Sequence, residues 1–507
     1  MQGSTDFKNN PALLSRSPVL GAKGPLLAIA GILFVFIPGA YWMGGSRPEL
    51  LEGFIVPWPA LWAQILAAAG VLGLLLIPLA WVAASRTLDL LALFLAQNSL
   101  LLAGYFFLNA TAWKIKGAGP GILETGSLVV LINVAGFAIL FAVMGATYLL
   151  AVLSSARLSP LRAEPLEYDR LLIWFLRAAG GSVALVIALP MAISGTIPLL
   201  ADDPVQARFA MVQSDAARAL YHAGTAILPF ITGGLILFVL RRPARMFGVD
   251  GWIAGAIVLI QILTSNRLPL AITLFATLTL FTLERKLPRL VLVAAFAGFL
   301  ALFAGLSGFT AILRQDRSAL EEGNPVAQSL EEAFLGDNLI DLRDAAWVFS
   351  EWDFQPLNGR TYLGGLAAML PSGIFTLKKE WHLGLTGIRI VGWDPGEHFG
   401  LRITFFGESF LNFGPAGVVA LAVVMGCLFG VLLRSLHLAA AKRPPCLHYN
   451  LKIVILMQMC LPLSNTSDAF TFWSMAAFLG LQWLAVDLPL RFCKTSALRP
   501  PYAPSRV

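Results

Sequence analysis

The residues best suited to chemistry fall in one polar interval, residues 310–408, of a chain that is otherwise mostly apolar. Residues 359–402 carry five lysines and arginines against three acids, Glu380, Asp394 and Glu397. They lead into a Gly-Glu-Ser-Phe-Leu-Asn-Phe-Gly-Pro run, residues 407–415, at the start of an apolar stretch. A basic surface beside a membrane suits an anionic lipid-linked substrate, because cations bind phosphate oxygens strongly. We therefore expect the chemistry of this protein in this interval.

The composition is that of a membrane protein with many spans. The 507 residues are 57% hydrophobic and only 13% charged, with a mean hydropathy of +0.76. We expect a single integral membrane domain over residues 1–507. The net charge of +7 does not indicate nucleic acid as a partner, because lysine and arginine beside membrane spans mainly report orientation. The four cysteines form no CxxC pair and no cluster with histidine, so neither a disulfide framework nor a zinc site is indicated.

Apolar runs of about twenty residues are long enough to cross the hydrocarbon core of a bilayer. The sequence therefore predicts an all-α polytopic membrane protein with about 12 transmembrane helices. The candidate spans are residues 24–43, 58–84, 88–108, 126–153, 171–193, 219–240, 251–265, 268–283, 290–309, 410–433, 448–464 and 470–490.

The distribution of lysine and arginine predicts the orientation of these spans, since short cytoplasmic loops are enriched in both. With the N-terminus in the cytoplasm, the inside segments hold 20 of them and the short outside loops hold six. Both termini are then cytoplasmic, residues 491–507 form a cytoplasmic tail, and residues 310–408 form one large outer loop between spans 9 and 10. Arg177 lies near a cytoplasmic helix end, where a snorkelling side chain is the simplest interpretation.

Local patterns predict some structure around the loop. Apolar residues at helical spacing indicate an amphipathic helix over about 325–350, with most of the acids of this region on a solvated face. The half after Gly359 is rich in glycine, proline and aromatic residues and is expected to be irregular structure folded onto the membrane domain. Four glycines in the next span are spaced for close helix packing: Gly414, Gly417, Gly426 and Gly430.

Four short stretches carry a resemblance to a known family. They are Gly-Thr-Ile-Pro-Leu-Leu at 195–200 followed by Arg208, Thr-Ser-Asn-Arg at 264–267, Gly-Arg-Thr-Tyr at 359–362, and Gly-Glu-Ser-Phe-Leu-Asn-Phe-Gly-Pro-Ala-Gly at 407–417. Together these resemble the Wzy-type oligosaccharide repeat-unit (O-antigen) polymerases over about residues 190–435.

The resemblance implies an enzyme of the bacterial inner membrane that acts at the periplasmic face. In such a reaction the growing glycan on undecaprenyl pyrophosphate is transferred to the next lipid-linked repeat unit of an O-antigen or exopolysaccharide. The lipid pyrophosphate is already an activated leaving group, so no cofactor, nucleotide sugar or metal is expected. A chain-length regulator protein is a possible partner, besides the lipid-linked oligosaccharides and membrane lipid.

This reaction has two chemical demands. Charge on the leaving pyrophosphate needs stabilisation, and the planar fork of arginine suits it; the candidates are Arg208, Arg267, Arg360, Arg389 and Arg402. For each of them, pairing with a nearby acid or a lipid headgroup is the competing interpretation. The acceptor hydroxyl needs a general base, and Glu408 and His398 are the candidates. Glu408 could instead complement a helix dipole, and His398 could be an exposed loop histidine.

Two other functions compete with polymerisation. An O-antigen ligase, which transfers a finished glycan to lipid A core, also has about twelve spans and a large outer loop. A twelve-span transporter or flippase commonly shows two related halves and charged residues within its spans. We find no such halves, and the predicted spans are almost free of ionisable residues, which favours chemistry at the outer face.

Overall fold

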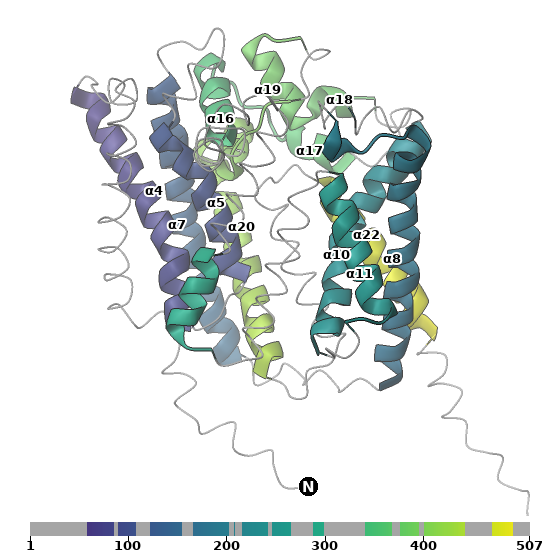
Figure 1. The fold of residues 1–507 in the computed structure, drawn as a ribbon. Coiled ribbons are helices and arrows are strands. Elements are labelled where there is room, and N and C mark those ends of the chain that lie inside the picture. The colour runs from purple at the N-terminus through teal and green to yellow at the C-terminus, as the bar shows by residue number, and fades with distance from the viewer. Residues whose placement is uncertain are drawn as a thin grey trace, which may run out of the picture. The chain divides into compact units, whose positions relative to one another are not determined.

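The computed structural model describes residues 58–85, 90–107, 122–154, 166–201, 207, 215–241, 246–264, 287–298, 340–367, 376–394, 400–441 and 469–489. In these ranges the regular structure is entirely helical (Figure 1). The chain divides into two compact units. Unit 1 comprises residues 1–156, 281–438 and 460–469, and unit 2 comprises residues 157–280, 439–459 and 470–507.

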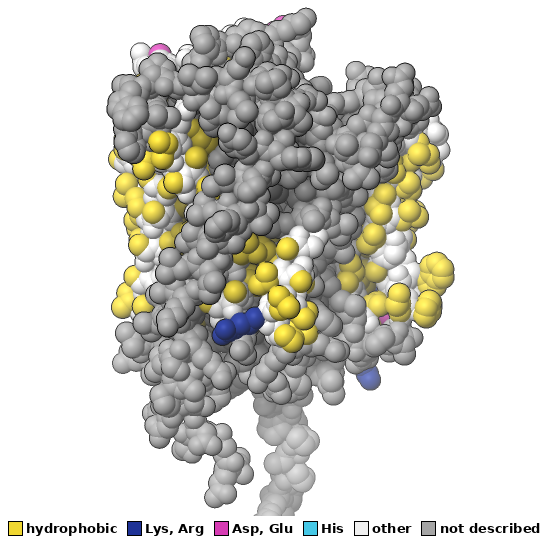
Figure 2. Space-filling model, turned by 60° about the vertical axis from the view of Figure 1, so that its left-hand side comes forward, with side chains coloured by type: hydrophobic (Ala, Val, Ile, Leu, Met, Phe, Trp, Pro, Cys, Tyr) yellow, Lys and Arg dark blue, Asp and Glu magenta, His cyan; other side chains and the backbone are white. Residues whose placement is uncertain are grey.

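Four of the described helices are long and apolar enough to cross a membrane: Gln64–Ala84, Thr125–Ala151, Arg170–Ser194 and Phe405–Arg434. Shorter apolar helices cover Leu91–Ala103, Val249–Leu263, Arg289–Gly298 and Ala476–Asp487. Hydrophobic side chains are exposed along the described helices, as in a protein surrounded by lipid (Figure 2). The chain is thus a helical membrane protein. The number of about twelve spans stays a prediction, because residues 24–43, 268–283 and 448–464 lie outside the described residues, as does the tail 491–507.

Unit 1 is built on long apolar helices. α4 (Trp58–Ser85) packs against α5 (Leu90–Ala103) and α7 (Ile122–Ser154), and the short 3-10 helix η2 (Gly104–Phe107) follows α5. At one end of unit 1 lie four shorter helices, α16 (Ile340–Glu351), α17 (Arg360–Leu366), α18 (Lys378–Trp381) and α19 (Leu383–Val391) (Figure 1). α16 contacts α5, α7 and α19, and α17 contacts α18 and α19. We call these four helices the end layer.

The last helix of unit 1, α20 (Phe405–Ala441), reverses direction within its length. Gly414 has non-helical backbone angles, φ 63° and ψ −154°. The ring of Phe94 lies 5.5 Å from the ring of Phe405 and 4.7 Å from that of Phe429. A straight helix would separate residues 405 and 429 by about 36 Å, so no straight helix fits these contacts. α20 is therefore a hairpin of a short arm, residues 405–413, and a long arm, residues 415–441.

The reversal moves the start of the predicted span 410–433 to Pro415, and the rest of that span coincides with the long arm. Only the long arm runs the length expected of a span, and the short arm returns into the core of unit 1. A Cβ on Gly417 would lie 2.6 Å from the carbonyl oxygen of Ser409, which shows how closely the two arms approach. Because the short arm folds back beside the long arm within unit 1, we call it re-entrant; membrane proteins tolerate such segments where protein surrounds them.

Glycines and aromatic rings hold the hairpin against α7. A Cβ on Gly426 would lie 2.8 Å from the carbonyl oxygen of Leu140, and one on Gly430 would lie 2.9 Å from that of Met144. These contacts confirm the predicted packing role of both glycines. On the short arm, the ring of Phe406 packs edge-on against that of Phe137, with centroids 5.2 Å apart.

The end layer differs from its prediction in two ways. The region after Gly359, expected to be irregular, contains α17, α18 and α19. The helix expected over 325–350 is described from Ile340 onward, and its apolar residues Leu342, Ala346 and Phe349 are buried as predicted. Asp344 is an exception among the acids, which were mostly expected to be solvated: it is buried and pairs with Arg343 at 3.2 Å.

Unit 2 contains α8 (Leu166–Ser194), α10 (Asp215–Arg241) and α11 (Val249–Leu263), which contact one another. The 3-10 helix η4 (Pro198–Leu200) contacts α11. α22 (Ala469–Gln482) places Phe478 against Phe230 of α10, with rings 5.5 Å apart, and continues into the π-helical turn η8 (Trp483–Asp487), which contacts α8.

Arg177 in unit 2 does not snorkel alone. Its Nε and Nη2 atoms donate to the two carboxylate oxygens of Asp250 at 2.5 and 2.9 Å, and Asp250 is buried in the first turn of α11. The guanidinium also lies 5.5 Å from the ring centroid of Trp174. A bidentate ion pair with Asp250 and a cation–π contact with Trp174 therefore hold Arg177. The sequence interpretation missed both interactions.

Candidate functional site

The Gly414-Pro415 pair interrupts the helix at the point where α20 reverses. Proline has no backbone N–H, so the carbonyl of Leu411, four residues earlier, has no helical donor. The left-handed φ of Gly414 then turns the chain away before the carbonyl of Asn412 can find one. The backbone carbonyls of Leu411 and Asn412 therefore have no hydrogen-bond donor within the helix. Because they lie inside unit 1, they need donors from elsewhere in the chain.

A loop from the end layer supplies these donors. The backbone N–H of Leu357 donates to the carbonyl of Leu411 at 3.0 Å, and the N–H of Asn358 donates to that of Asn412 at 3.0 Å. Gly359 follows with φ 80° and lies so close to Phe413 that a Cβ there would be 2.9 Å from the ring. Only glycine combines this conformation with this approach. The loop 352–359 therefore completes the hydrogen bonding of the short arm and starts α17 directly beside it.

A buried polar cluster lies where α17 meets the short arm. The Thr361 hydroxyl donates to Glu408 Oε1 at 2.7 Å. The Asn412 side-chain Nδ2 donates to the Thr361 Oγ1 at 2.7 Å and to the Glu408 backbone carbonyl at 2.9 Å. Within the described residues, Asn412 Oδ1 has no hydrogen-bond partner. We call Glu408, Thr361 and Asn412 the buried cluster.

Glu408 is 1% exposed in this arrangement, so its carboxylate has no surface from which to reach a substrate. A buried carboxylate is held by the groups that bond to it, and Thr361 covers it from α17. Glu408 can act as a general base only if a movement of the surrounding residues, Thr361 among them, exposes its carboxylate. In the described state the carboxylate links the short arm to α17 through this hydrogen bond.

A second set of polar contacts fixes the beginning of the short arm. Asn133 of α7 donates from Nδ2 to Thr404 Oγ1 at 2.8 Å and accepts from the backbone N–H of Phe406 at 3.4 Å. Phe406 N–H belongs to the first turn, which has no helical acceptor of its own. A side chain from another helix thus caps the short arm, and all three residues are buried.

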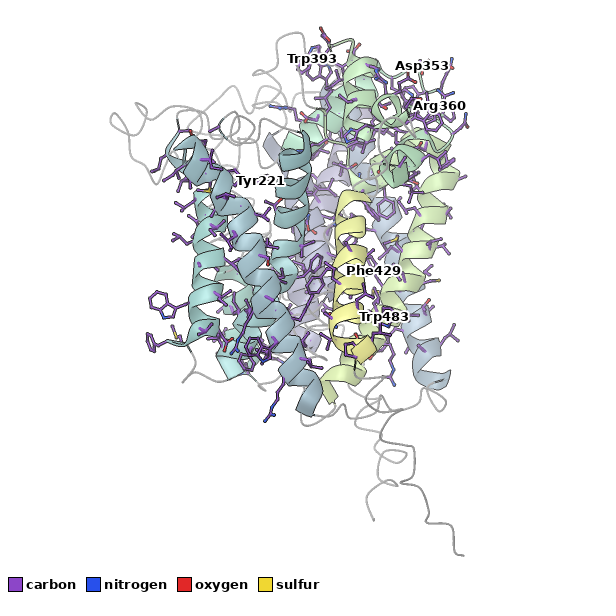
Figure 3. The ribbon with its side chains drawn as sticks, turned by 90° about the vertical axis from the view of Figure 1, so that its right-hand side faces the viewer. Tyr221, Asp353, Arg360, Trp393, Phe429 and Trp483 are labelled. Carbon is purple, nitrogen blue, oxygen red and sulfur yellow. The ribbon has the colours of Figure 1, made fainter. Side chains whose placement is uncertain are left out.

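Three of the five candidate arginines are described, and all belong to unit 1. Arg360 begins α17, Arg389 lies in the last turn of α19, and Arg402 precedes α20; each is exposed. Arg389 Nη1 donates to the backbone carbonyl of Glu380 at 2.7 Å, so part of its fork is occupied. Figure 3 shows Arg360 at the same end of unit 1 as Asp353 and Trp393, whereas Phe429 lies midway along the long arm.

Arg402 is held by its backbone. Its N–H donates to Asp344 Oδ2 at 3.3 Å, and the next residue toward the N-terminus, Leu401, donates its N–H to the carbonyl of Gly384 at 3.1 Å. Gly384 and Gly400 approach each other so closely that a Cβ on Gly384 would lie 3.0 Å from the Cα of Gly400. The buried Asp344 therefore anchors the segment that leads into the short arm.

The other predicted site residues, Arg208, Arg267 and His398, lie outside the described residues. Their roles stay predictions. Among the described residues, no group of three histidine, cysteine, aspartate or glutamate side chains could hold a metal ion.

Sequence reasoning missed several residues of this region, namely Asn133, Asp344, Thr361 and Asn412. For two of these residues, the sequence contained a pattern that could have identified them. Asn412 follows Glu408 by four residues and so shares its helix face, and Thr361 is part of the Gly-Arg-Thr-Tyr stretch in which only Arg360 drew attention. Asn133 and Asp344 had none, because their partners lie 271 and 58 residues away.

The fold and site define a class: a helical membrane protein with a re-entrant short arm and a buried polar cluster beneath an arginine-bearing end layer. Comparisons with family models, curated proteins and solved structures give no significant match.

Proposed function

We propose that this chain polymerises undecaprenyl-pyrophosphate-linked oligosaccharide repeat units at the periplasmic face of the bacterial inner membrane. In this proposal about twelve spans cross the membrane, both termini are cytoplasmic, and the end layer is part of the periplasmic loop 310–408. The product is an O-antigen or an exopolysaccharide.

One observation carries the proposal more than any other. A carboxylate, Glu408, lies in a re-entrant arm directly below an end layer that exposes Arg360, Arg389 and Arg402. An ionisable residue at such depth is rarely kept without a functional reason. A carboxylate in the short arm could accept a proton, and arginines in the end layer could bind a leaving pyrophosphate. This combination fits a glycosyl transfer from a lipid pyrophosphate.

The proposed step is a displacement at the anomeric carbon of the donor glycan. A hydroxyl oxygen of the acceptor repeat unit attacks the anomeric carbon of the donor glycan, and the bond from that carbon to the pyrophosphate oxygen breaks. Undecaprenyl pyrophosphate leaves, with its charge stabilised by arginines. The hydroxyl proton passes to a base, for which we propose Glu408 once Thr361 has withdrawn, with His398 as the second candidate.

The test is the glycan pattern of a strain that lacks the gene. Loss of polymer with single repeat units left on the lipid or on lipid A core supports polymerisation. Accumulation of long lipid-linked chains assigns a ligase instead, and accumulation of repeat units on the cytoplasmic side assigns a flippase. Purified protein that extends lipid-linked repeat units in liposomes without other proteins then separates catalysis from assembly.

A further inference from the structure

α17 exposes its two leucines and buries its threonine and its two glycines. Thr361, Gly364 and Gly365 are buried against the rest of unit 1. Leu363 and Leu366, three residues apart on the opposite face, are 50% and 60% exposed. Arg360 lies three residues before Leu363 and is on the same exposed face. A helix at a water-facing surface has the reverse pattern, so this face needs an apolar partner.

The length of the long arm indicates the depth at which α17 lies relative to a bilayer. Nineteen residues without a charge, Pro415–Leu433, separate the reversal from Arg434. At about 1.5 Å per residue they span roughly 30 Å, the thickness of a hydrocarbon core. If Arg434 marks one boundary of that core, the reversal at Gly414 marks the other. The contacts of Leu357, Asn358 and Gly359 with residues 411–413 attach α17 at this second boundary.

The exposed face of α17 continues the lipid-facing surface of the long arm. That surface includes Val419, Val423 and Val424, all exposed, and reaches Phe413 at the reversal, which is 48% exposed. Tyr362 of α17 stacks on Phe413 with the ring planes 9° apart. The apolar surface is therefore continuous from the long arm through Phe413 to α17, and all of it belongs to unit 1.

We propose that α17 is an interfacial helix that lies on the bilayer surface, with Leu363 and Leu366 in the outermost acyl region and Arg360 at the depth of the lipid phosphates. Phospholipid is the occupant that fits, because the exposed face combines two leucines with one cation at the level where acyl chains meet headgroups. Seated there, α17 holds Thr361 over Glu408 from the membrane side. The inference does not depend on polymerase activity.

Spin labels test this placement in nanodiscs of phosphatidylglycerol and phosphatidylcholine. Single cysteines replace Leu363, Leu366 or Asp353 in a chain whose four native cysteines are alanine. Asp353 is the matched control, because it is exposed at the same end of unit 1 but is charged (Figure 3). We expect labels at 363 and 366 to be relaxed more by oxygen than by a water-soluble nickel chelate, and the label at 353 to show the opposite preference.

Two results would overturn the inference. Labels at 363 and 366 that prefer the nickel chelate as strongly as 353 place α17 in water. Labels that neither reagent reaches place it under another protein surface. A photoreactive amino acid at 363 or 366 in the otherwise native chain gives an independent answer, because crosslinks to phospholipid support the placement and crosslinks only within the chain refute it.

Discussion

The Thr361 hydroxyl donates a 2.7 Å hydrogen bond to Glu408, although 47 residues separate the two in the chain. This contact joins α17, which carries Arg360 at its first position, to the re-entrant short arm of α20. A movement of either partner therefore changes both the exposure of the carboxylate and the position of the arginine. Three of the four predictions below concern this junction.

Replacement of Thr361 by valine keeps the shape of the side chain but removes both the donor to Glu408 and the acceptor for Asn412. We expect a loss of about 1–3 kcal/mol in stability, because buried polar groups lose partners. Thr361→Ser should restore most of it. Thermal unfolding in one detergent measures the effect, and Thr386→Val, at a less buried threonine of the end layer, is the control with a change below about 1 kcal/mol. Equal shifts for the two valine variants would contradict the buried cluster.

Replacement of Glu408 by glutamine separates its two candidate roles. The amide oxygen can still accept from Thr361, so we expect the thermal stability of Glu408→Gln to stay close to that of the wild type. An amide cannot take a proton, so polymer formation should fall by about a hundredfold or more if Glu408 is the base. Glu408→Ala should lose stability and polymer together.

The informative outcome is the glycan pattern of the glutamine variant at normal protein level. If the glycan keeps its wild-type chain length, Glu408 is not the base and serves only to position α17. The role of base would then pass to His398, which His398→Gln tests in the same strain.

Replacement of Gly414 by alanine tests the reversal of α20. A Cβ there would meet nothing within 4 Å, so any effect comes from the backbone, whose φ of 63° and ψ of −154° are reached almost only by glycine. We expect a loss of about 1–3 kcal/mol. Gly145→Ala in α7 is the matched control, because its Cβ is equally unobstructed in a regular helix, and it should be neutral or stabilising by up to about 1 kcal/mol. If both variants unfold at the same temperature, the hairpin is refuted.

Substitutions of Arg177 and Asp250 in unit 2 should have non-additive effects on the free energy of unfolding, because the two side chains form an ion pair. Arg177→Met leaves the buried carboxylate without its two guanidinium donors, and we expect a loss of about 3–5 kcal/mol. Adding Asp250→Asn removes the uncompensated charge, so the double variant should be more stable than Arg177→Met alone. A double-mutant cycle by chemical unfolding measures this coupling, and strictly additive effects would show that the two side chains act independently.

The sequence alone predicted what depends on composition and short-range spacing. Apolar runs such as 126–153 had to become helices, since a bilayer leaves no other partner for their backbone groups. Gly426 and Gly430 had to face a neighbour, because four-residue spacing places both on one side of the helix. Those predictions agree with α7 and α20.

Tertiary structure decided the site. Gly414-Pro415 is compatible with a kink as well as with a reversal, and the choice depends on donors from Leu357 and Asn358 and on Phe94, all remote in sequence. In the same way, the sequence shows Glu408 as an acid near a helix start, but its burial depends on tertiary contacts, among them the hydrogen bond from Thr361 of α17. A carbonyl or a carboxylate removed from water needs a specific partner, and only the folded chain brings that partner within hydrogen-bonding distance.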